Sequence, residues 1–196
     1  MPRRNEESPN SRGFEALPHR LRRDDALACV MAVRSLVAYP DPRLRSMAAP
    51  VTVFDDELGK LAADLIDTMR AASGIGITAP HIGIAQRLVV LELSPEAGPQ
   101  IYVNPIIEWT SAELERHPEG SVSMPGVTAE IERPARVRVR YQDLTGAAQG
   151  EDASGLRAVC HQHEIDQLDG LFWIQRLSAL KRDQIIRRYQ KLQRLG

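Results

Sequence analysis

The sequence has few cysteines, almost no net charge and no long apolar run. Two cysteines in 196 residues, Cys29 and Cys160, are too few for the disulfide framework of a small secreted protein. No apolar stretch approaches the roughly 20 residues that a membrane-spanning helix requires. The formal net charge of -1 gives no overall attraction to nucleic acid or to an acidic membrane surface. These shortages predict a protein of the reducing cytoplasm, without a membrane segment and without specific nucleic-acid binding.

The chain contains enough apolar sequence for one domain with a sizeable core. Hydrophobic residues make up 43% of it and charged residues 26%, which is typical of a soluble globular protein. Residues 1–30 differ, because they are rich in charge, Pro, Ser and Asn and show no apolar periodicity beyond a single turn. We therefore expect a disordered N-terminal extension over 1–30 and a single domain over 31–196. An equally good interpretation is that translation starts at Met31.

The pattern of the folded part favours an α+β protein. The stretch "VFDDELGKLAADLIDTMRAA" predicts an amphipathic helix that Asp55 or Asp56 caps and that ends before Gly74, because its apolar residues recur on one face. Further helices are expected from about 156 to 168 and from about 177 onward. Three Val- and Ile-rich stretches predict strands: "RLVVLEL", "IYVNPIIEW" and "ARVRVRYQDL". Because helices and strands do not alternate regularly, the order indicates α+β.

Three short stretches carry residues that are suited to chemistry. The first, "GIGITAPHIG", has glycines that let the backbone approach a ligand or another segment closely, but it follows a helix and lacks the context of a dinucleotide-binding loop. The second, "PEGSVSMPG", is a turn that leads into an extended segment. The third, "CHQHEIDQLDG", is a helix on which His163 and Gln167 share a face, with Glu164 beside them. It begins like a His-Glu-x-x-His zinc helix, but Gln167 stands where the second histidine belongs.

In order and spacing, the three stretches resemble the signatures of the peptide deformylase family, hydrolases that remove the formyl group from the N-terminal methionine of new bacterial chains. The family signatures are Gly-x-Gly-φ-Ala-Ala-x-Gln, Glu-Gly-Cys-φ-Ser and Gln-His-Glu-x-Asp-His-Leu-x-Gly, and this chain has "GIGITAPH", "EGSVS" and "QHEIDQLDG". The resemblance spans about residues 33–195. It implies the peptide deformylase fold, in which short antiparallel or mixed sheets surround a central helix with the His-Glu motif, and a C-terminal helix follows.

Carried over by position, the metal ligands of the family fall on Ser121, His163 and Gln167. Family members hold Fe2+, or Zn2+ or Ni2+ in preparations, through one cysteine and two histidines. Here a neutral hydroxyl and a neutral amide replace a thiolate and an imidazole, so only His163 is a good ligand. The resemblance therefore implies a degenerate metal site. We expect no cofactor, or Fe2+, Zn2+ or Ni2+ if the site still binds metal, and in place of a metal either water or a hydrogen bond among the three side chains.

The catalytic positions of the family correspond to His81, Val122 and Glu164. The resemblance assigns oxyanion binding to the His81 side chain, where the family has glutamine, and to the backbone N–H of Val122. A histidine still donates a hydrogen bond in the right tautomer. Glu164 corresponds to the general base that takes a proton from metal-bound water. Without a metal, that water keeps a pKa of about 16, and a carboxylate is a poor base for it.

The methionine pocket of the family implies Ile75, Gly76, Val159 and Cys160 as substrate-binding residues. Burial of a methionine side chain there would contribute about 2 kcal/mol, so the protein could bind formyl-methionine or acylated N-termini without cleaving them. An alternative is that the apolar members of this set are core residues, and Cys160 is expected to be a small buried hydrophobe. We expect His117 and His161 at the surface or in loops.

Four functional interpretations remain open, and we favour a deformylase-like protein with little or no hydrolysis of formyl peptides. The alternative is an active peptide deformylase with an altered ligand set. A third is a new site, in which His81 joins His163 and Glu164 around a metal, or Ser121 acts as nucleophile with His163 as base, although no orienting acid is evident. The last is a structural protein. The basic C-terminal helix could contact ribosomal RNA, but a solvated face is the simpler explanation.

Deleting residues 1–30 should leave the melting temperature within a few degrees of that of the full chain, because a segment without apolar periodicity has little surface to bury. Thermal unfolding of both proteins, followed by circular dichroism, measures this. A large loss would mean that the extension packs on the domain, and Phe14 and Leu17 would be the first anchors to test.

Overall fold

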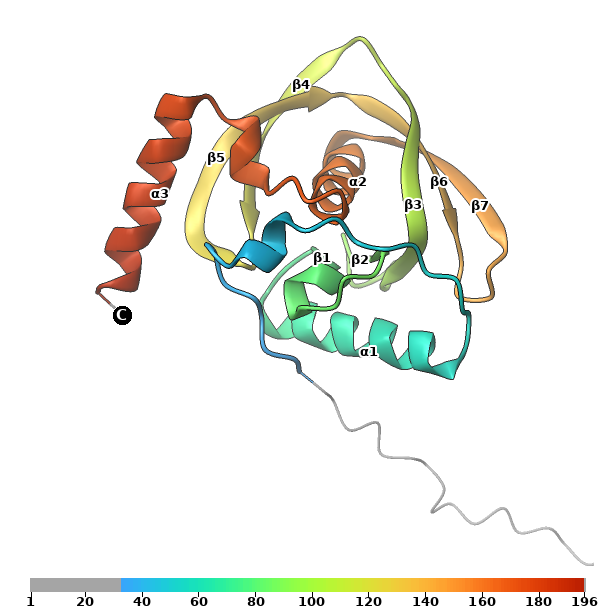
Figure 1. Cartoon of the computed structure of the whole chain (residues 1–196). Coiled ribbons are helices and arrows are strands. Elements are labelled where there is room, and N and C mark those ends of the chain that lie inside the picture. The colour runs from blue at the N-terminus through green and yellow to red at the C-terminus, as the bar shows by residue number, and fades with distance from the viewer. Residues whose placement is uncertain (1–32, 196) are drawn as a thin grey trace, which may run out of the picture. The chain divides into compact units, whose positions relative to one another are not determined.

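Helix α2, Gly155–Leu168, occupies the centre of the fold, and strands of two sheets surround it (Figure 1). The structure is a computed structural model that describes residues 33–195, so the expectation for residues 1–30 lies outside the described residues. Helices combined with antiparallel sheets confirm the predicted α+β class. Organisation as a single domain over 31–196 stays a prediction.

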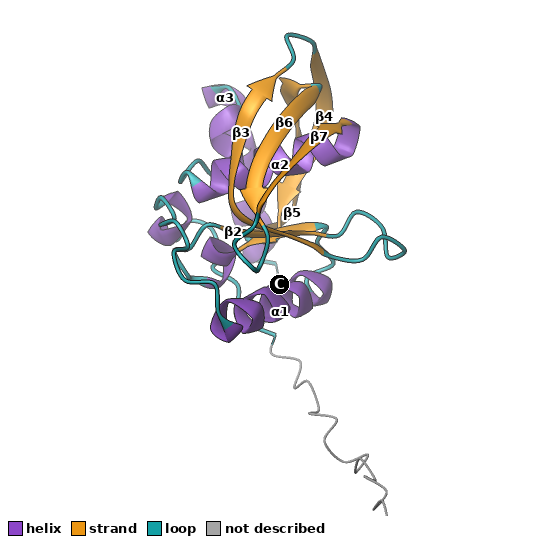
Figure 2. Cartoon of the chain, turned by 90° about the vertical axis from the view of Figure 1, so that its right-hand side faces the viewer, coloured by secondary structure: helices purple, strands orange, loops and turns teal. Residues whose placement is uncertain are grey.

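All strand pairings are antiparallel in the described part of the chain. Five strands form a sheet in the order β1-β2-β3-β6-β7, and β4 and β5 form a separate hairpin (Figure 2). The strands are β1 Gly76–Thr78, β2 Leu88–Leu91, β3 Gln100–Thr110, β4 Leu114–Ser121, β5 Met124–Pro134, β6 Arg136–Gln142 and β7 Ala148–Ser154. The other helical elements are η1 Pro42–Arg45, α1 Asp56–Ala71, η2 Ala79–Ile82, η3 Trp173–Arg176 and α3 Ala179–Gln193.

Helix α1 confirms the predicted amphipathic helix and its cap. The Asp55 carboxylate accepts hydrogen bonds from the backbone N–H groups of Glu57 and Leu58, both 3.1 Å long, and so satisfies two donors at the helix start. On the apolar face, Leu65 and Met69 are fully buried in a cluster with residues of β1 and β2, and Leu61 and Ile66 are partly buried against it. This packing places the loop after α1 next to β1.

Strands β1, β4, β5 and β7 have no counterpart among the strands that the sequence predicts. The edge strand β7 pairs only with β6 and is mostly polar, so it lacks the apolar alternation of a half-buried strand. The stretch "PEGSVSMPG", predicted as a turn into one extended segment, is the tip of a hairpin: it ends β4, turns at Val122 and Ser123, and starts β5. His117 lies on β4 and is partly exposed.

Helix α2 is buried over most of its surface, and much of what it buries is polar. Gln162, Glu164, Asp166 and Gln167 are all buried. The expectation that His161 lies at the surface is wrong, because its side chain is 1% exposed and its Nε2 contacts the Glu151 carboxylate of β7. With strands on several sides of α2, no free face remains for a surface histidine. Each buried polar group on this helix therefore requires a partner.

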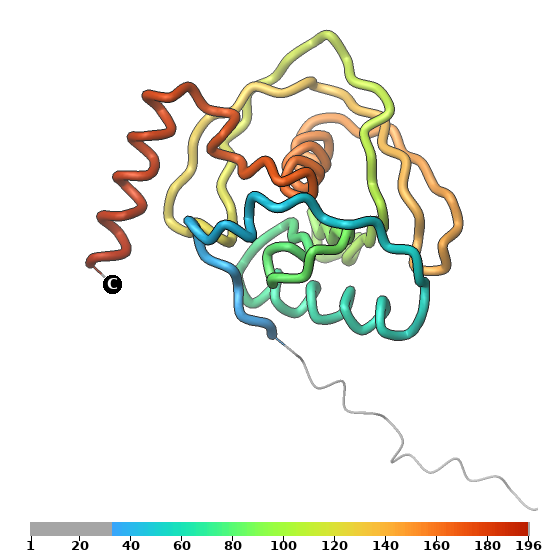
Figure 3. Tube along the Cα trace, in the orientation of Figure 1, coloured from blue at the N-terminus to red at the C-terminus, as the bar shows by residue number. Residues whose placement is uncertain are grey.

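The segment of residues 33–51 crosses the end of α2 and ties three parts of the fold together (Figure 3). Backbone N–H groups of Val37 and Tyr39 donate to the carbonyls of His81 and Ser123, over 2.7 and 2.8 Å. Ala48 N–H donates to the carbonyl of Leu168 at the end of α2, over 2.8 Å. Within residues 33–195, no helix has the length and apolar character to cross a membrane.

Asn104 holds this N-terminal segment against β3. Its backbone has a φ of 52°, in the left-handed region that most side chains avoid but asparagine tolerates. The side-chain oxygen accepts from Val51 N–H, and the amide nitrogen donates to the Val51 carbonyl and to Gln142 Oε1, each over 2.8 Å. One side chain thus replaces a missing strand partner for Val51.

Replacing Asn104 with alanine should lower the free energy of unfolding by about 2–4 kcal/mol, because two backbone groups lose their partners and the left-handed backbone becomes strained. Asn104→Gly serves as the matched control: it loses the same hydrogen bonds but relieves the strain, so it should be about 1 kcal/mol less destabilised than Asn104→Ala. Urea denaturation of the three proteins measures both differences. Equal free energies of unfolding for the parent and both variants would show that the side-chain hydrogen bonds of Asn104 contribute nothing to stability.

Candidate active site

A cavity of about 380 Å³ lies beside the first half of α2. The loop after α1, η2, the β4–β5 turn and α2 form its walls, and the volume is in the range of small-molecule sites. All the site residues expected from the sequence except Gln167 line it: Ile75, Gly76, His81, Ser121, Val122, Val159, Cys160, His163 and Glu164. The fold therefore brings together residues that are up to about 90 positions apart in the chain.

One wall of the cavity is apolar. Val159 and Cys160 of α2 are buried, and Ile75, which also lines the cavity, is half exposed. Burial raises the pKa of the Cys160 thiol to about 12, so this residue is a neutral, small hydrophobic side chain as predicted. This wall is suited to an unbranched apolar side chain.

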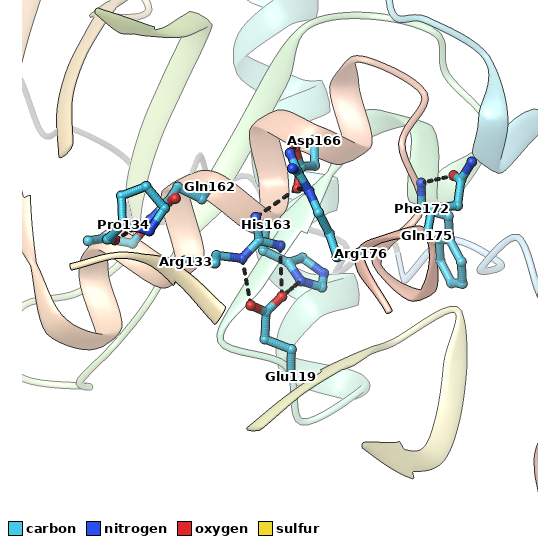
Figure 4. A network of polar contacts seen from close by, with 10 residues as sticks. Glu119, Arg133, Pro134, Gln162, His163, Asp166, Phe172, Gln175 and Arg176 are labelled. Atoms are coloured by element: carbon cyan, nitrogen blue, oxygen red, sulfur yellow. Dashed lines mark hydrogen bonds and ion pairs between the residues drawn. The ribbon is translucent and has the colours of Figure 1, made fainter. Parts of the chain in front are cut away.

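His163 is oriented by a buried carboxylate. Its Nδ1 lies 2.8 Å from Oε2 of Glu119, whose carboxylate also accepts two hydrogen bonds from Arg133, over 2.6 and 2.9 Å (Figure 4). Burial opposes ionisation of Glu119, but hydrogen bonds from Arg133 and His163 lower its pKa to about 2. The ionised Glu119 requires a proton on Nδ1 of His163. In neutral His163, the lone pair is therefore on Nε2.

Arg133 connects this pair to the rest of α2. Its Nη1 donates to the Asp166 carboxylate over 2.8 Å, and Arg176 of η3 donates to the same carboxylate. The side chains of Arg133 and Glu119 are 4% and 3% exposed, so an unpaired charge here would be costly. Neither Glu119 nor Arg133 was predicted from the sequence. The one available signal was that Glu119 stands two residues before Ser121 in the same motif, but the strand register is irregular between them, so regular alternation does not predict the contact with His163.

Glu164 presents an unpartnered carboxyl group to the cavity. Its Oε2 is buried and has no hydrogen-bond partner among the described residues. Burial raises the pKa of Glu164 to about 7, against a smaller opposing effect of His163. Gly76 of β1 lies directly against it, so a Cβ at that position would overlap the Glu164 carboxyl oxygen. Gly76 thus supports the site by its missing side chain, as the sequence predicted for a close approach.

His81 is held as a neutral hydrogen-bond donor. The backbone N–H of Thr78 donates to its Nδ1 over 3.0 Å, which makes Nδ1 an acceptor and assigns the proton to Nε2. Burial and the nearby charge of His163 lower the pKa of His81 to about 3. Nε2 lies 3.5 Å from Oγ of Ser121, so its N–H points toward the cavity. With its proton on Nε2 and its Nδ1 occupied, His81 is arranged to bind an oxyanion and not a metal.

Gln167 faces away from the cavity. Its Nε2 donates to the backbone carbonyl of Leu44 over 2.8 Å, and its side chain is buried against η1. The hydrogen bonds that we expected among Ser121, Gln167 and His163 are not formed, because each side chain has another partner: His81, Leu44 and Glu119, respectively. The buried amide finds its acceptor in the segment that crosses the end of α2.

The side chains at the three ligand positions do not fit the metal ion that is bound by the family that the sequence resembles. Ser121 offers a neutral hydroxyl, and the amide of Gln167 is committed to Leu44, so His163 is the one strong donor of the three positions. In residues 33–195, no group of three or more His, Cys, Asp or Glu side chains is arranged to hold a metal ion.

Gly76→Ala should lower the free energy of unfolding by about 1–3 kcal/mol, because the new methyl group overlaps the Glu164 carboxyl and a methyl of Leu91. The matched control is Gly59→Ala in α1, where a Cβ meets nothing within 4 Å and a helix interior gains about 0.5–1 kcal/mol from the same change. Chemical denaturation of both variants measures the contrast. If Gly76→Ala is as stable as the parent, the contact between β1 and Glu164 is not tight.

Comparison with known proteins identifies the family. The family model described as polypeptide deformylase matches residues 33–183. In Brucella suis biovar 1 (strain 1330), a protein named peptide deformylase-like is 68% identical over 164 residues, which are 84% of this chain and 100% of that protein. A second protein of that strain, named peptide deformylase, is 45% identical over 165 residues, 83% of this chain and 94% of its own length.

The fold leads to the same family. The crystal structure of a peptide deformylase from Legionella pneumophila matches with a TM-score of 0.80 and 37% sequence identity, covering 84% of this chain and 97% of that one. The predicted fold, with a central His-Glu helix between antiparallel sheets and a helix at the C-terminal end, is confirmed. The chain belongs to the polypeptide deformylase family, as a divergent, peptide deformylase-like member.

Proposed function

We propose that this protein binds the N-termini of N-formyl- or N-acyl-methionyl peptides and hydrolyses them little or not at all by the metal-dependent route of its family. The observation that carries the proposal is the side chain of Gln167, which donates to the Leu44 carbonyl and leaves the cavity without a third ligand. Ser121, with a neutral hydroxyl, replaces the thiolate of the family signature. No cofactor is part of this proposal.

The cavity offers complementary groups for such a ligand. The acyl oxygen would accept hydrogen bonds from Nε2–H of His81 and from the backbone N–H of Val122, and the methionine side chain would contact Val159 and Cys160. Burial of that side chain contributes about 2 kcal/mol. Glu164, whose Oε2 has no partner in the described residues, would accept the amide N–H of the ligand. Binding therefore requires no metal.

The ligand class also suggests where the protein works. N-formylmethionyl peptides arise during bacterial translation, so we place the protein in the cytoplasm. Helix α3 has basic residues, but most of them are exposed and a solvated helix face explains them, and the proposal includes neither ribosomal RNA nor a membrane as a partner. Two proteins of one Brucella suis strain, one named peptide deformylase and one named peptide deformylase-like, show that both forms occur together in one organism.

Binding is tested with metal-depleted full-length protein and a formyl-Met-Ala-Ser tripeptide in a calorimeter, with formate assayed after the titration. We expect saturable binding and no formate. The matched control ligand is formyl-Gly-Ala-Ser, which lacks the apolar side chain and should bind about 10-fold or more weakly. Equal binding of both peptides, or of neither, would remove the support for a methionine pocket. Formate release by protein with stoichiometric Fe2+, Zn2+ or Ni2+ would establish the active deformylase instead.

Restoring the ligand set should restore the reaction of the family. Ser121→Cys together with Gln167→His rebuilds the three-ligand set, whereas each single change leaves a weak ligand, so the gains in metal affinity and rate should be strongly non-additive. Gln167→His also gives up the bond to Leu44, which should cost about 1 kcal/mol of stability. Adding His81→Gln should raise the rate further, by up to about 10²-fold.

The readouts are uptake of Zn2+ and Ni2+ and formate release from a formyl-methionyl tripeptide, for the parent, both single variants, the double and the triple variant. A parent as fast as the double variant would contradict the proposal, because Ser121 and Gln167 would then never have disabled the site. A double variant that binds metal but stays inert would show that the cavity itself has been repurposed.

A further inference from the structure

We infer that Ser121 is a nucleophile, with His163 as its general base and Glu119 as the positioning acid, and that the site cleaves carboxylic esters whose acyl group enters the cavity. This activity goes beyond the proposed binding function and uses no metal. It gives a chemical role to three polar side chains at the cavity that the binding proposal leaves without one.

The structure supplies the element that the sequence lacked, an acid to orient the base. Glu119 Oε2 accepts the Nδ1–H of His163 over 2.8 Å, and two hydrogen bonds from Arg133 fix the carboxylate in place (Figure 4). The pair is nearly inaccessible to solvent, with side-chain exposures of 12% for His163 and 3% for Glu119. This is the relation between acid and histidine in a catalytic triad, and it leaves the lone pair of Nε2 available as a base.

Ser121 is held with its hydrogen available. It ends β4 immediately before the two-residue turn, and its Oγ accepts hydrogen bonds from the Ser123 backbone N–H, at 3.2 Å, and from Nε2–H of His81, at 3.5 Å. Two accepted bonds use both lone pairs, so the Ser121 hydroxyl hydrogen requires a separate acceptor. His163 lines the same cavity, and although the structure shows no hydrogen bond between the two side chains, we assign its Nε2 as that acceptor. His81 cannot act as the base, because its Nδ1 accepts from Thr78 and its Nε2 carries the proton.

Donors for a developing oxyanion flank the same hydroxyl. The Nε2–H of His81 lies next to Ser121 Oγ. The backbone N–H of Val122 belongs to the residue that follows the nucleophile, and serine hydrolases use the N–H at that position to bind the oxyanion. The apolar wall with Val159 and Cys160 takes the side chain of the acyl group. Nucleophile, oriented base, oxyanion donors and acyl pocket thus surround one cavity.

The reaction has two balanced steps. Ser121 Oγ attacks the ester carbonyl and its proton passes to Nε2 of His163; the C–O bond to the alcohol breaks, and the alcohol leaves with that proton. Water then attacks the acyl-serine, gives a proton to His163, and Ser121 regains its hydrogen as the carboxylic acid departs. Esters are the substrate class because an alcohol is a better leaving group than the amine of a formyl peptide.

The test uses full-length protein that has been treated with a chelator, an alkyl fluorophosphonate probe and the p-nitrophenyl ester of N-acetyl-methionine. We expect one covalent adduct per chain, located on Ser121 by mass spectrometry of peptides, and a burst of p-nitrophenol of about one equivalent. Ser121→Ala should remove both signals. His163→Asn should slow labelling by about 10²-fold or more, since a general base contributes on that order.

The matched control is Ser123→Ala, which deletes a hydroxyl from the same turn. Its Oγ has no partner among residues 33–195, and its bond to Ser121 comes from the backbone N–H, which alanine keeps, so labelling should be unchanged. No adduct on Ser121 in the parent protein, or equal labelling of Ser121→Ala, overturns the inference. The adduct site in the parent decides the matter even if a variant fails to fold. Retained peptide binding without an adduct would overturn this inference alone, and an adduct without peptide binding would overturn only the binding function.

Discussion

The structure depends on a helix that is buried while carrying polar side chains. Strands of both sheets surround α2, so most of its polar side chains are buried and bond to protein groups, while His163 and Glu164 line the cavity. The partners come from every side: Glu119 and Arg133 from the hairpin, Glu151 from β7, and a backbone carbonyl of η1. The requirement for these partners sets the position of the hairpin, the edge strand and the N-terminal segment around α2.

The same requirement for hydrogen-bond partners explains the direction of the Gln167 side chain, which stands at a metal-ligand position of the family. A buried amide at Gln167 needs an acceptor, and the Leu44 carbonyl lies close enough to provide one, so the side chain has become a link between α2 and η1. His163, in contrast, keeps a carboxylate partner of the kind that orients metal-binding histidines in other proteins. Although two of the three ligand positions of the family carry neutral side chains here, the network of His163, Glu119 and Arg133 is intact, and a cavity with an oriented histidine lies beside it.

Much of the fold could be predicted from sequence, because local patterns determine it. The cap at Asp55 and the apolar face of α1 follow from short-range periodicity, and the three Val- and Ile-rich strands follow from composition. The edge strand β7 was not predicted, because its mostly polar residues lack the apolar alternation of a half-buried strand. The burial of His161 was not predicted either, because it depends on contacts with strands, such as β7 with Glu151, and not on the local sequence.

The candidate site shows the same division. The three motifs contain most of the residues that line the cavity, but the groups that those residues contact depend on the tertiary structure. Neither the link from Gln167 to Leu44, across 123 positions, nor the pairing of His163 with Glu119 across 44 has a local sequence signal. These two contacts set the directions of the two side chains, because Gln167 turns toward η1 and Glu119 accepts from Nδ1 of His163. The positions could therefore be named from the sequence, but the tautomers and the directions of the side chains could not.

The central claim is that the side chain of Gln167 belongs to the fold and not to a metal site. Anomalous diffraction at the nickel edge, from crystals of the protein grown with excess Ni2+, tests it directly. The account predicts that the Gln167 amide contacts the Leu44 carbonyl and that no anomalous peak lies within coordinating distance of both Ser121 and His163. A nickel ion bound there, with the Gln167 side chain turned away from Leu44 to ligate it, would contradict the account.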